Sequence, residues 1–315
     1  MIGSFKIKNN TTGAEVLLGQ DIDCDYVYKD DGLDWGSAPA QHNTYSYPGQ
    51  IGSSISSTVI KERDISIMGY VYYFLTVDEM KDMPRSQWRD YGYEIIKRKK
   101  EQLNNIINPD NFVRLSINDY YIEGKPSSSV VYGKTMEENN EYFCKFLINI
   151  FCNNPMFKKN TITKTVLSGS YAMLHSPFVI PPYGIVGGRR NNYLMLSVEN
   201  EGNAEIGGRI ILTAKGEIKN PSVENVGTGE TITINKTMQN GERIIISTLK
   251  GKERGIVGII DEVEMDYFQY WDFRNTWFQF QQGTTLIGYS TENDSENKLD
   301  VVIEINPEKY ALEEM

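Results

Sequence analysis

The sequence contains few of the side chains that most often carry catalysis or bind metals. Only 2 histidines and 3 cysteines occur among 315 residues. Neither His42 nor His175 has a cysteine or a second histidine near it in the chain, as a zinc site would require. Because Cys24, Cys144 and Cys152 are odd in number and widely spaced, we expect free thiols in place of a disulfide framework.

Complete cofactor and nucleophile motifs are missing as well. Two glycine-rich segments, residues 184–188 and 251–255, complete neither of the phosphate-binding glycine patterns and are better explained as turns. The sequence has no G-x-S-x-G nucleophile elbow and no calcium-binding loop. We therefore predict no catalytic residue, no cofactor-binding residue and no metal site, and we expect that the protein is not an enzyme.

Charge and hydropathy narrow the choice of partners. With 32 basic and 42 acidic residues the formal net charge is −10, which argues against nucleic acid as a partner, because binding phosphates needs a basic surface. The one basic cluster, residues 97–100, is typical of a solvated helix face. No apolar run approaches the ~18 residues of a membrane span, and the first residues lack a secretory signal. We expect folding in a cytoplasm, without membrane contact.

The hydrophobic pattern that is present indicates a mainly β protein with one clear helix. Alternation of apolar residues over residues 65–73 and 142–151 is typical of strands, and shorter strands are expected at 5–7, 15–18, 112–117 and 120–124. Between them, apolar residues recur every three or four positions up to Pro109, which predicts an amphipathic helix. The predicted buried face of this helix consists of Trp88, Tyr91, Ile95, Lys99, Leu103 and Ile106.

A change of composition divides the chain into two domains. Residues 1–157 are predicted as the first domain, and residues 158–192, rich in Ser, Thr, Pro and Gly, as a linker. Residues 193–315 show short strands separated by turn residues, which is typical of a β-sandwich. Its strands are expected at 193–199, 208–214, 230–235, 242–248, 275–281, 285–289 and 298–305.

Two polar intervals of the first domain are candidates for contacts. Residues 30–54 form a loop-like stretch that carries Trp35, Tyr45 and Tyr47. Such a loop either docks on a partner subunit or packs on its own domain, and the residues favour neither alternative. Residues 125–141 are predicted as a hairpin or a long loop.

The remaining candidate site combines acids with aromatic residues. Asp261, Glu262, Glu264 and Asp266 precede a cluster of aromatic side chains, which consists of Tyr267, Phe268, Tyr270, Trp271 and Phe273. Aromatic faces stack on sugar rings, and paired carboxylates hydrolyse glycosides. Sugar binding and polysaccharide hydrolysis are therefore alternative interpretations, although a chain with 42 acids produces such neighbours by chance.

The order of these features resembles the distal tail protein family of long-tailed bacteriophages. The residues that carry the likeness are 63–69 (RDISIMG), 103–109 (LNNIINP), 151–157 (FCNNPMF), 198–203 (VENEGN), 218–221 (IKNP), 241–248 (GERIIIST) and 277–287 (WFQFQQGTTLI). They span nearly the whole chain in the family's order, and the ordered set is more specific than any one of them.

The resemblance implies a structural protein of the virion tail, made in the cytoplasm of the host bacterium. In the family the N-terminal domain, a β-sandwich with one amphipathic helix and a β-hairpin, forms a hexameric ring. That ring lies between the tail-tube protein and a tail-associated lysin or tip protein. A galectin-like C-terminal sandwich projects outward, where it can meet a receptor-binding protein or a cell-wall glycan. The alternative function is a carbohydrate-binding module acting at the bacterial cell surface.

The hairpin predicted at residues 125–141 leads to a first test. Hairpins and strand edges suit pairing with a partner strand. We therefore expect deletion of residues 125–141 to leave both domains folded while abolishing the ring. Light scattering measures the outcome, and an unchanged oligomer mass would contradict it.

Overall fold

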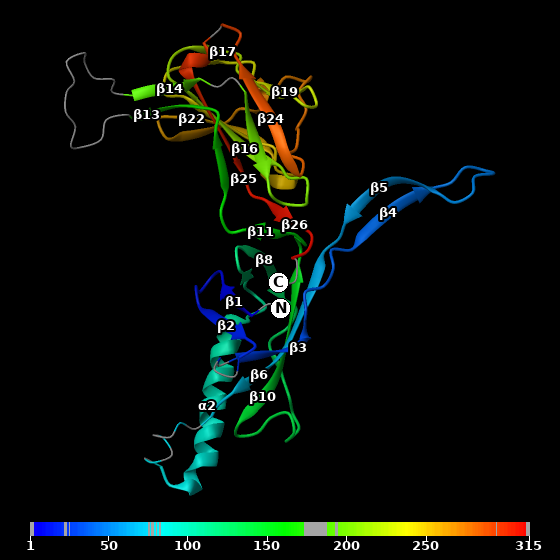
Figure 1. The fold of residues 1–315 in the computed structure, drawn as a ribbon, viewed down its shortest axis with the longest axis vertical. Coiled ribbons are helices and arrows are strands. Elements are labelled where there is room, and N and C mark those ends of the chain that lie inside the picture. Colours follow the sequence, from blue (N-terminus) through cyan, green and yellow to red (C-terminus); the bar gives the residue numbers. More distant parts are fainter. Residues whose placement is uncertain are drawn as a thin grey trace, which may run out of the picture. The chain divides into compact units, whose positions relative to one another are not determined.

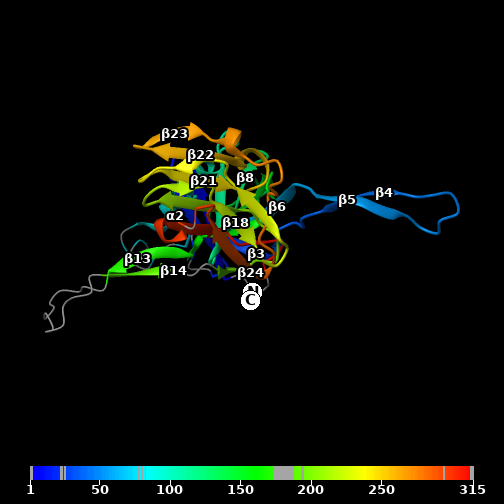
Figure 2. The same cartoon turned by 90° about the horizontal axis from the view of Figure 1, so that it is seen from above.

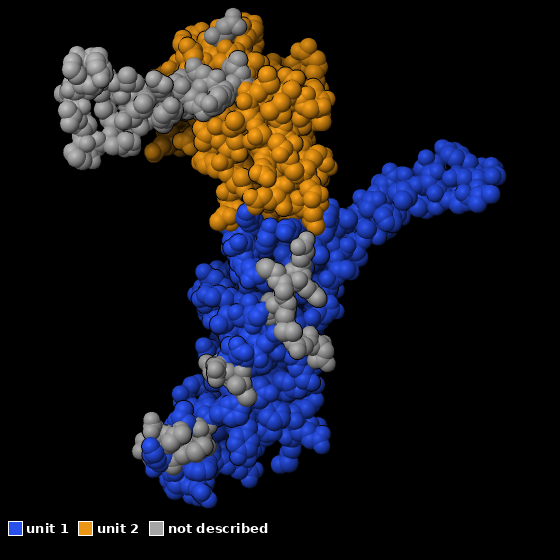
Figure 3. All heavy atoms as spheres, viewed as in Figure 1, with its two compact units in different colours: residues 1–160, 309–315 blue, residues 161–308 orange. Residues whose placement is uncertain are grey.

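The chain is organised as two compact units. The computed structural model describes residues 3–21, 24, 26–74, 76, 79, 81, 83–172, 188–192, 195–293 and 295–312. Unit 1 comprises residues 1–160 and 309–315, and unit 2 comprises residues 161–308 (Figure 3). The last residues of the chain therefore return to the first unit, so two chain crossings connect the units.

Unit 1 is built on one ten-stranded sheet, and its mainly β character confirms the predicted fold class (Figure 1). The strand order is β26-β11-β8-β7-β1-β2-β3-β6-β10-β9. The strands are β1 (Ser4–Asn9), β2 (Glu15–Gly19), β3 (Tyr26–Asp34), β6 (Arg63–Tyr72), β7 (Val113–Ile117), β8 (Tyr120–Pro126), β9 (Val131–Tyr132), β10 (Phe143–Cys152), β11 (Phe157–Lys159) and β26 (Glu308–Lys309).

A second pairing of β8 closes this sheet into a barrel. Ile150 lies opposite Pro126, and Phe151 lies opposite Lys125, so that β10 meets β8. Gly124 makes this approach possible, because a Cβ there would lie 2.6 Å from the Phe151 carbonyl oxygen. The barrel encloses alternating apolar residues of its strands, where the prediction had a sandwich of two sheets.

Helix α2 (Arg85–Ile106) packs against β1, β2 and β6, and it ends before Asn108 and Pro109 as predicted. Its last turn is held by Asn9, whose buried amide donates to the Ile106 carbonyl at 2.9 Å. The buried positions are Gly92, Ile96, Leu103 and Ile106. Of the predicted face, Leu103 and Ile106 are buried, whereas Trp88, Tyr91, Ile95 and Lys99 are half-buried. Gly92 and Ile96 were not predicted, and the backbone of Glu141 lies against Gly92. Within the described residues, no helix is sufficiently long and apolar to cross a membrane.

The interval 125–141 is part of the barrel and not a free hairpin. Val130 is buried in the core of unit 1, and β9 pairs with β10. Asn139 accepts a hydrogen bond from the Lys100 ammonium group at 2.9 Å. Deleting this interval would remove core and pairing residues together. Loss of the ring in that variant would therefore not by itself identify a subunit contact.

Unit 2 contains two main sheets. They have the orders β12-β25-β16-β21-β22-β23 and β15-β24-β18-β19, and a short pair β17-β20 accompanies them. The strands are β12 (Thr163–Val166), β15 (Met195–Asn200), β16 (Gly208–Ala214), β17 (Ile218–Lys219), β18 (Ser222–Asn225), β19 (Glu230–Thr233), β20 (Thr237–Met238), β21 (Arg243–Ser247), β22 (Gly255–Ile260), β23 (Val263–Asp266), β24 (Gly283–Ser290) and β25 (Leu299–Ile305). Both sheets bury alternate residues, as two packed sheets do.

Several stretches of unit 2 differ from their predicted structure. Residues 275–281 were expected as a strand, but they form irregular chain with one isolated bridge from Phe280 to Ile206. The Asn275 side chain bonds both backbone groups of Thr233, which holds the start of this stretch as a loop. Conversely, the hairpin of β22 and β23 and the short strands β17, β18 and β20 were not predicted.

The interval expected as a linker also contains strands. Besides β11 and β12, it includes the hairpin of β13 (Ser168–Ala172) and β14 (Gly188–Asn192), and residues 173–187 lie outside the described residues. β12 pairs with β25 at the edge of the six-stranded sheet. Edge strands are solvated on one side, so their polar composition resembles that of a linker.

The cysteines are free, in agreement with the sequence. Cys144 and Cys152 are buried in β10, and Cys24 is half-buried. Burial is also the main reason why the pKa of the Cys152 thiol is raised to about 12.

Gly92 provides a test of helix packing in which two effects have opposite signs. Helix propensity alone would make Gly92→Ala stabilising by about 1 kcal/mol. The new Cβ, however, would lie 2.5 Å from the Glu141 carbonyl oxygen. We expect the steric effect to win and the free energy of unfolding to fall by about 1–3 kcal/mol in urea denaturation. Gly3→Ala, which meets nothing within 4 Å, is the matched control. A rise in stability for Gly92→Ala would contradict the packing.

Candidate interaction sites: an uncharged arm and a polar pocket

An antiparallel hairpin extends away from the barrel of unit 1 (Figures 1 and 2). It consists of β4 (Ala40–Tyr45) and β5 (Ser54–Ile60), and we call residues 40–60 the arm. Every residue of β4 is exposed, and so are the five central residues of β5. Short polar side chains connect the strands, with His42 Nδ1 2.9 Å from the Thr58 hydroxyl and the Asn43 amide donating to Ser57 at 2.9 Å.

The arm has no charged side chain, although it is exposed to solvent. Residues 35–60 contain no Asp, Glu, Lys or Arg, while these types make up 23% of the chain. Its exposed apolar residues are Tyr45, Tyr47, Ile51, Ile55 and Val59. Depletion of charge together with exposed aromatic and aliphatic groups is the composition of an interface core. A two-stranded hairpin is also marginally stable alone in water. The arm is therefore suited to being covered by a partner.

The aromatic residues of the predicted loop at 30–54 divide between packing on their own domain and exposure on the surface. Trp35 packs inside unit 1, with its ring 5.4 Å from Phe5 and 6.0 Å from Phe157. Tyr45 and Tyr47 contact each other at 5.3 Å and stay exposed on the arm. The first aromatic residue therefore belongs to the core, and the other two belong to a surface.

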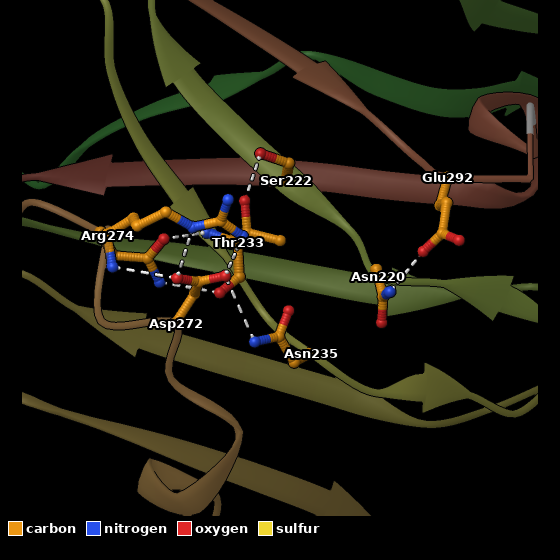
Figure 4. Close-up of polar contacts among 8 residues, drawn as sticks. Asn220, Ser222, Thr233, Asn235, Asp272, Arg274 and Glu292 are labelled. Carbon is orange, nitrogen blue, oxygen red and sulfur yellow. Dashed lines mark hydrogen bonds and ion pairs between the residues drawn. The ribbon is translucent and has the colours of Figure 1, made fainter.

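Unit 2 contains a polar pocket of about 490 Å³. It lies where β19, the end of β24 and the loop after Trp271 meet (Figure 4). All lining residues are polar: Asn220, Thr231, Thr233, Asn235, Asp272, Arg274, Asn275, Ser290, Thr291 and Glu292.

Two ion pairs organise the charges of the pocket. Asp272 is 9% exposed and accepts bonds from Arg274 Nε at 3.1 Å and from Arg274 Nη2 at 2.8 Å. The pKa of the Asp272 carboxyl is held well below its usual range, chiefly by the hydrogen bonds from the Arg274 side chain. Across the pocket Glu292 pairs with Lys219 at 2.6 Å and accepts from the Asn220 amide, and these bonds lower the pKa of Glu292. Both acids therefore remain carboxylates at neutral pH.

The four acids that the sequence singled out do not line this pocket. Asp261 and Glu262 form the turn between β22 and β23, with positive φ angles of 50° and 68°. Asp266 accepts a bond from the Phe268 backbone at 2.8 Å, which supports the short helix η2 (Phe268–Tyr270). Glu264 is exposed on β23. Local turn structure thus accounts for Asp261, Glu262 and Asp266, and Glu264 is an exposed strand residue.

The aromatic residues of the same segment mostly contact one another. Trp271 stacks on Trp277 at 4.0 Å and on Phe268 at 6.4 Å. Phe273, in contrast, is fully exposed, and both of its chain neighbours line the pocket. Asp272 was missed as a site residue. The sequence DFRN at 272–275 could have indicated Asp272, because an Asp with an Arg two residues later can form a local ion pair.

The basic cluster at residues 97–100 and the two histidines were also singled out from the sequence. In the basic cluster, Lys97 and Arg98 are exposed, but Lys99 donates to the Tyr72 carbonyl at 2.9 Å and Lys100 to Asn139. His42 lies on the arm, whereas His175 and residues 184–187 lie outside the described residues. In the part of the chain that the structure describes, no cluster of His, Cys, Asp and Glu could hold a metal ion.

Removal of Arg274 tests the electrostatics of the pocket. In Arg274→Ala we expect the pKa of Asp272 to rise toward the ordinary value of about 3.9. Any stability that the pair contributes is present above that value and is lost as pH falls through the folded pKa, because this pKa is depressed. A ¹³C carboxyl titration of aspartate-labelled full-length protein measures the midpoint. Lys219→Ala, which alters only the opposite ion pair, should leave it unchanged. An unperturbed Asp272 midpoint in the wild type would contradict the pairing.

Comparison with known proteins shows similarity to phage tail components. Residues 201–304 match the family model of the siphovirus-type tail component, C-terminal domain. The SPP1 Dit protein, described as a paradigm of the hub adsorption apparatus in phages infecting Gram-positive bacteria, has a similar structure. Its TM-score is 0.58 at 12% identity, covering 96% of this chain and 98% of that one. A baseplate structure of phage p2, activated with Ca, gives 0.40 at 12% identity and covers 96% and 98% of the two chains. No curated protein sequence matches this chain.

These findings agree with the likeness predicted from the sequence. The matched family segment, residues 201–304, includes all residues of the polar pocket. The SPP1 Dit structure covers both units, so the fold likeness extends to unit 1, which the family model does not match. Residues 201–304 are therefore similar to the C-terminal domain of siphovirus-type tail components, and the chain as a whole has the fold of the SPP1 Dit protein.

Proposed function

We propose that the chain is the subunit of a distal tail hub, a structural protein of the virion tail that assembles into a hexameric ring. The observation that carries this proposal is the exposed, uncharged arm on unit 1, in a chain with a tail-component domain. A ring of identical subunits needs two different surfaces on each subunit, one of which receives the other. The arm supplies the first surface, and a second copy of the chain is its proposed partner.

Closure of the barrel supports this assignment of the arm. The long strands of the barrel are paired on both sides, and its sheet ends in the two-residue strands β9 and β26. Such short edges discourage pairing with other chains. The arm, by contrast, exposes the outer edges of both its strands and has no lysine or other charge that would oppose pairing. Assembly through the arm is thus favoured over assembly through the barrel edges.

The roles of the two units follow from this proposal. Unit 1, which contains the predicted domain 1–157, builds the ring and stacks between the tail-tube protein and a tail-associated lysin or tip protein. Unit 2, which contains most of the predicted domain 193–315, is a platform toward receptor-binding parts of the tail. Assembly takes place in the cytoplasm of the host bacterium. The protein acts by contacts and not by catalysis.

Native mass measurement with negative-stain imaging tests the ring. We expect the full-length protein to form a ring of about six times the monomer mass, with a central channel, because the heterologous contact closes. A stable monomer at all concentrations would contradict the proposal.

The arm itself can be removed cleanly in the same assay. Its two ends are already adjacent, since the Lys61 backbone donates to the Pro39 carbonyl at 2.8 Å. Replacing residues 40–60 by two glycines should leave unit 1 folded and abolish the ring. The point variant Ile55→Lys, which places a charge on the exposed arm, should also weaken the ring. Val263→Lys, at a residue of similar exposure in unit 2, is the control. An intact ring in the variant without the arm would contradict the role of the arm.

A further inference from the structure

The outer face of strands β6 and β10 in unit 1 carries apolar side chains where a solvated sheet usually carries polar ones. The two strands pair with each other over ten residues each. Alternate residues of both strands, among them Ile67 and Ile148, are buried in the core of the barrel. The residues between them point outward, and an antiparallel sheet with one solvated face is normally polar at such positions.

The outward residues form a continuous apolar surface, which we call the β6–β10 face. It consists of Met68, Tyr70, Tyr72, Phe74, Phe143 and Leu147. The Tyr72 ring lies 5.8 Å from the stacked ring of Phe74 and 5.7 Å from that of Tyr70, and Phe143 lies 5.6 Å from Tyr70. Phe74 is 51% exposed, and the other five residues are half-buried. Contiguous exposed apolar groups of this kind mark a surface for interaction.

Charges are sparse on the β6–β10 face. At the outward positions from Ser66 to Tyr72 and from Phe143 to Asn149, the one charged side chain is Lys145, which pairs with Glu138 at 3.5 Å. Charged residues make up 23% of the whole chain. Depletion of charge together with enrichment of aromatic residues is the composition of an interface core.

The face and the arm belong to the same run of chain but remain apart within one subunit. The arm enters β6 at Arg63, at the end opposite Tyr72, and extends away from the barrel (Figures 1 and 2). Helix α2 lies against the opposite side of this strand end, where the Tyr73 and Tyr91 rings are 5.9 Å apart. Each subunit therefore presents two different surfaces, as a head-to-tail ring requires.

The arm of a second copy has the chemistry that fits this face. Neither surface would bury an unpaired charge in the contact, since residues 35–60 contain no charged side chain. A two-stranded hairpin also needs another element to pack on, and a sheet face provides one. Tyr47 and Ile55 supply exposed apolar area from the arm. The hydroxyls of Tyr70 and Tyr72 both donate and accept, which matches the Ser, Thr and Asn side chains of the arm.

We propose that the β6–β10 face receives the arm of the neighbouring subunit, with Tyr72 and Phe74 as the central contacts. This inference rests on the proposed ring and names its second surface. Each subunit places its own arm on one neighbour and accepts the arm of the other neighbour. The contact is heterologous, so that repeating it closes the ring.

Photo-crosslinking of the full-length protein tests the contact directly. The photoreactive residue p-benzoylphenylalanine replaces Tyr47, an exposed aromatic residue of the arm. We expect irradiation to give a species of twice the monomer mass in denaturing electrophoresis. Mass spectrometry of its peptides should join position 47 to residues 66–74 or 143–149. The same photoreactive residue in place of Phe112, an exposed residue outside both surfaces, is the control and should not crosslink to these segments.

A charge on the β6–β10 face provides a second measurement. In Phe74→Lys we expect the concentration at which half of the subunits are assembled to rise about tenfold or more, because aromatic residues at the centre of an interface dominate its affinity. The unfolding midpoint of the monomer should not change, since Phe74 is exposed. Leu17→Lys is the matched control, because Leu17 is 46% exposed on β2, outside the face.

The outcomes separate this inference from the ring itself. A ring in which position 47 crosslinks to the arm of another copy, or to other parts of unit 1, would overturn the receiving role of the face while the ring stands. Unchanged assembly of Phe74→Lys would do the same and would leave the face to another protein of the tail. A protein that stays monomeric and gives no crosslinked dimer would contradict both the ring and its receiving face.

Discussion

The pairing of β8 with β10 is the interaction on which unit 1 depends. It closes seven strands into a barrel at Pro126 and Lys125, and it requires Gly124 because a larger residue would meet the Phe151 backbone. Closure pairs the long strands on both sides, which leaves few free edges. Helix α2 then covers β1, β2 and β6. The arm remains as the long exposed hairpin of the unit, so the same closure that stabilises the barrel concentrates its capacity for association in one place.

The two units carry surfaces of different chemistry. The arm presents uncharged side chains with exposed tyrosine and isoleucine, which suits a large contact with another protein. The pocket presents amides, hydroxyls and two ion pairs around an open cavity. The proposed roles follow this separation, with assembly assigned to unit 1 and the platform toward receptor-binding parts to unit 2. A change on one surface should therefore leave the other unaffected.

Local patterns predicted the elements whose residues are buried regularly. The alternation in 65–73 and 142–151 corresponds to β6 and β10, and the spacing up to Pro109 corresponds to α2. Prediction failed where long-range contacts override local pattern. The strand expected at 275–281 is a loop, because Asn275 bonds to Thr233 forty-two residues earlier. The burial of Gly92 in α2 was not predicted either, since it depends on the chain near Glu141, which packs on it.

The sequence by itself determined the mainly β class, the helix, the free thiols and the likeness to distal tail proteins, since these depend on composition, spacing and local order. The tertiary structure decided which polar residues act together. Asp272 and Arg274 pair locally, but Thr231 and Glu292 reach the same pocket only through the fold of unit 2. The sequence indicated residues 30–54 as a candidate for contacts, but only the structure shows that residues 40–60 form an exposed hairpin, whereas Trp35 is packed inside unit 1. Burial and convergence are properties of the folded chain, and local pattern alone does not contain them.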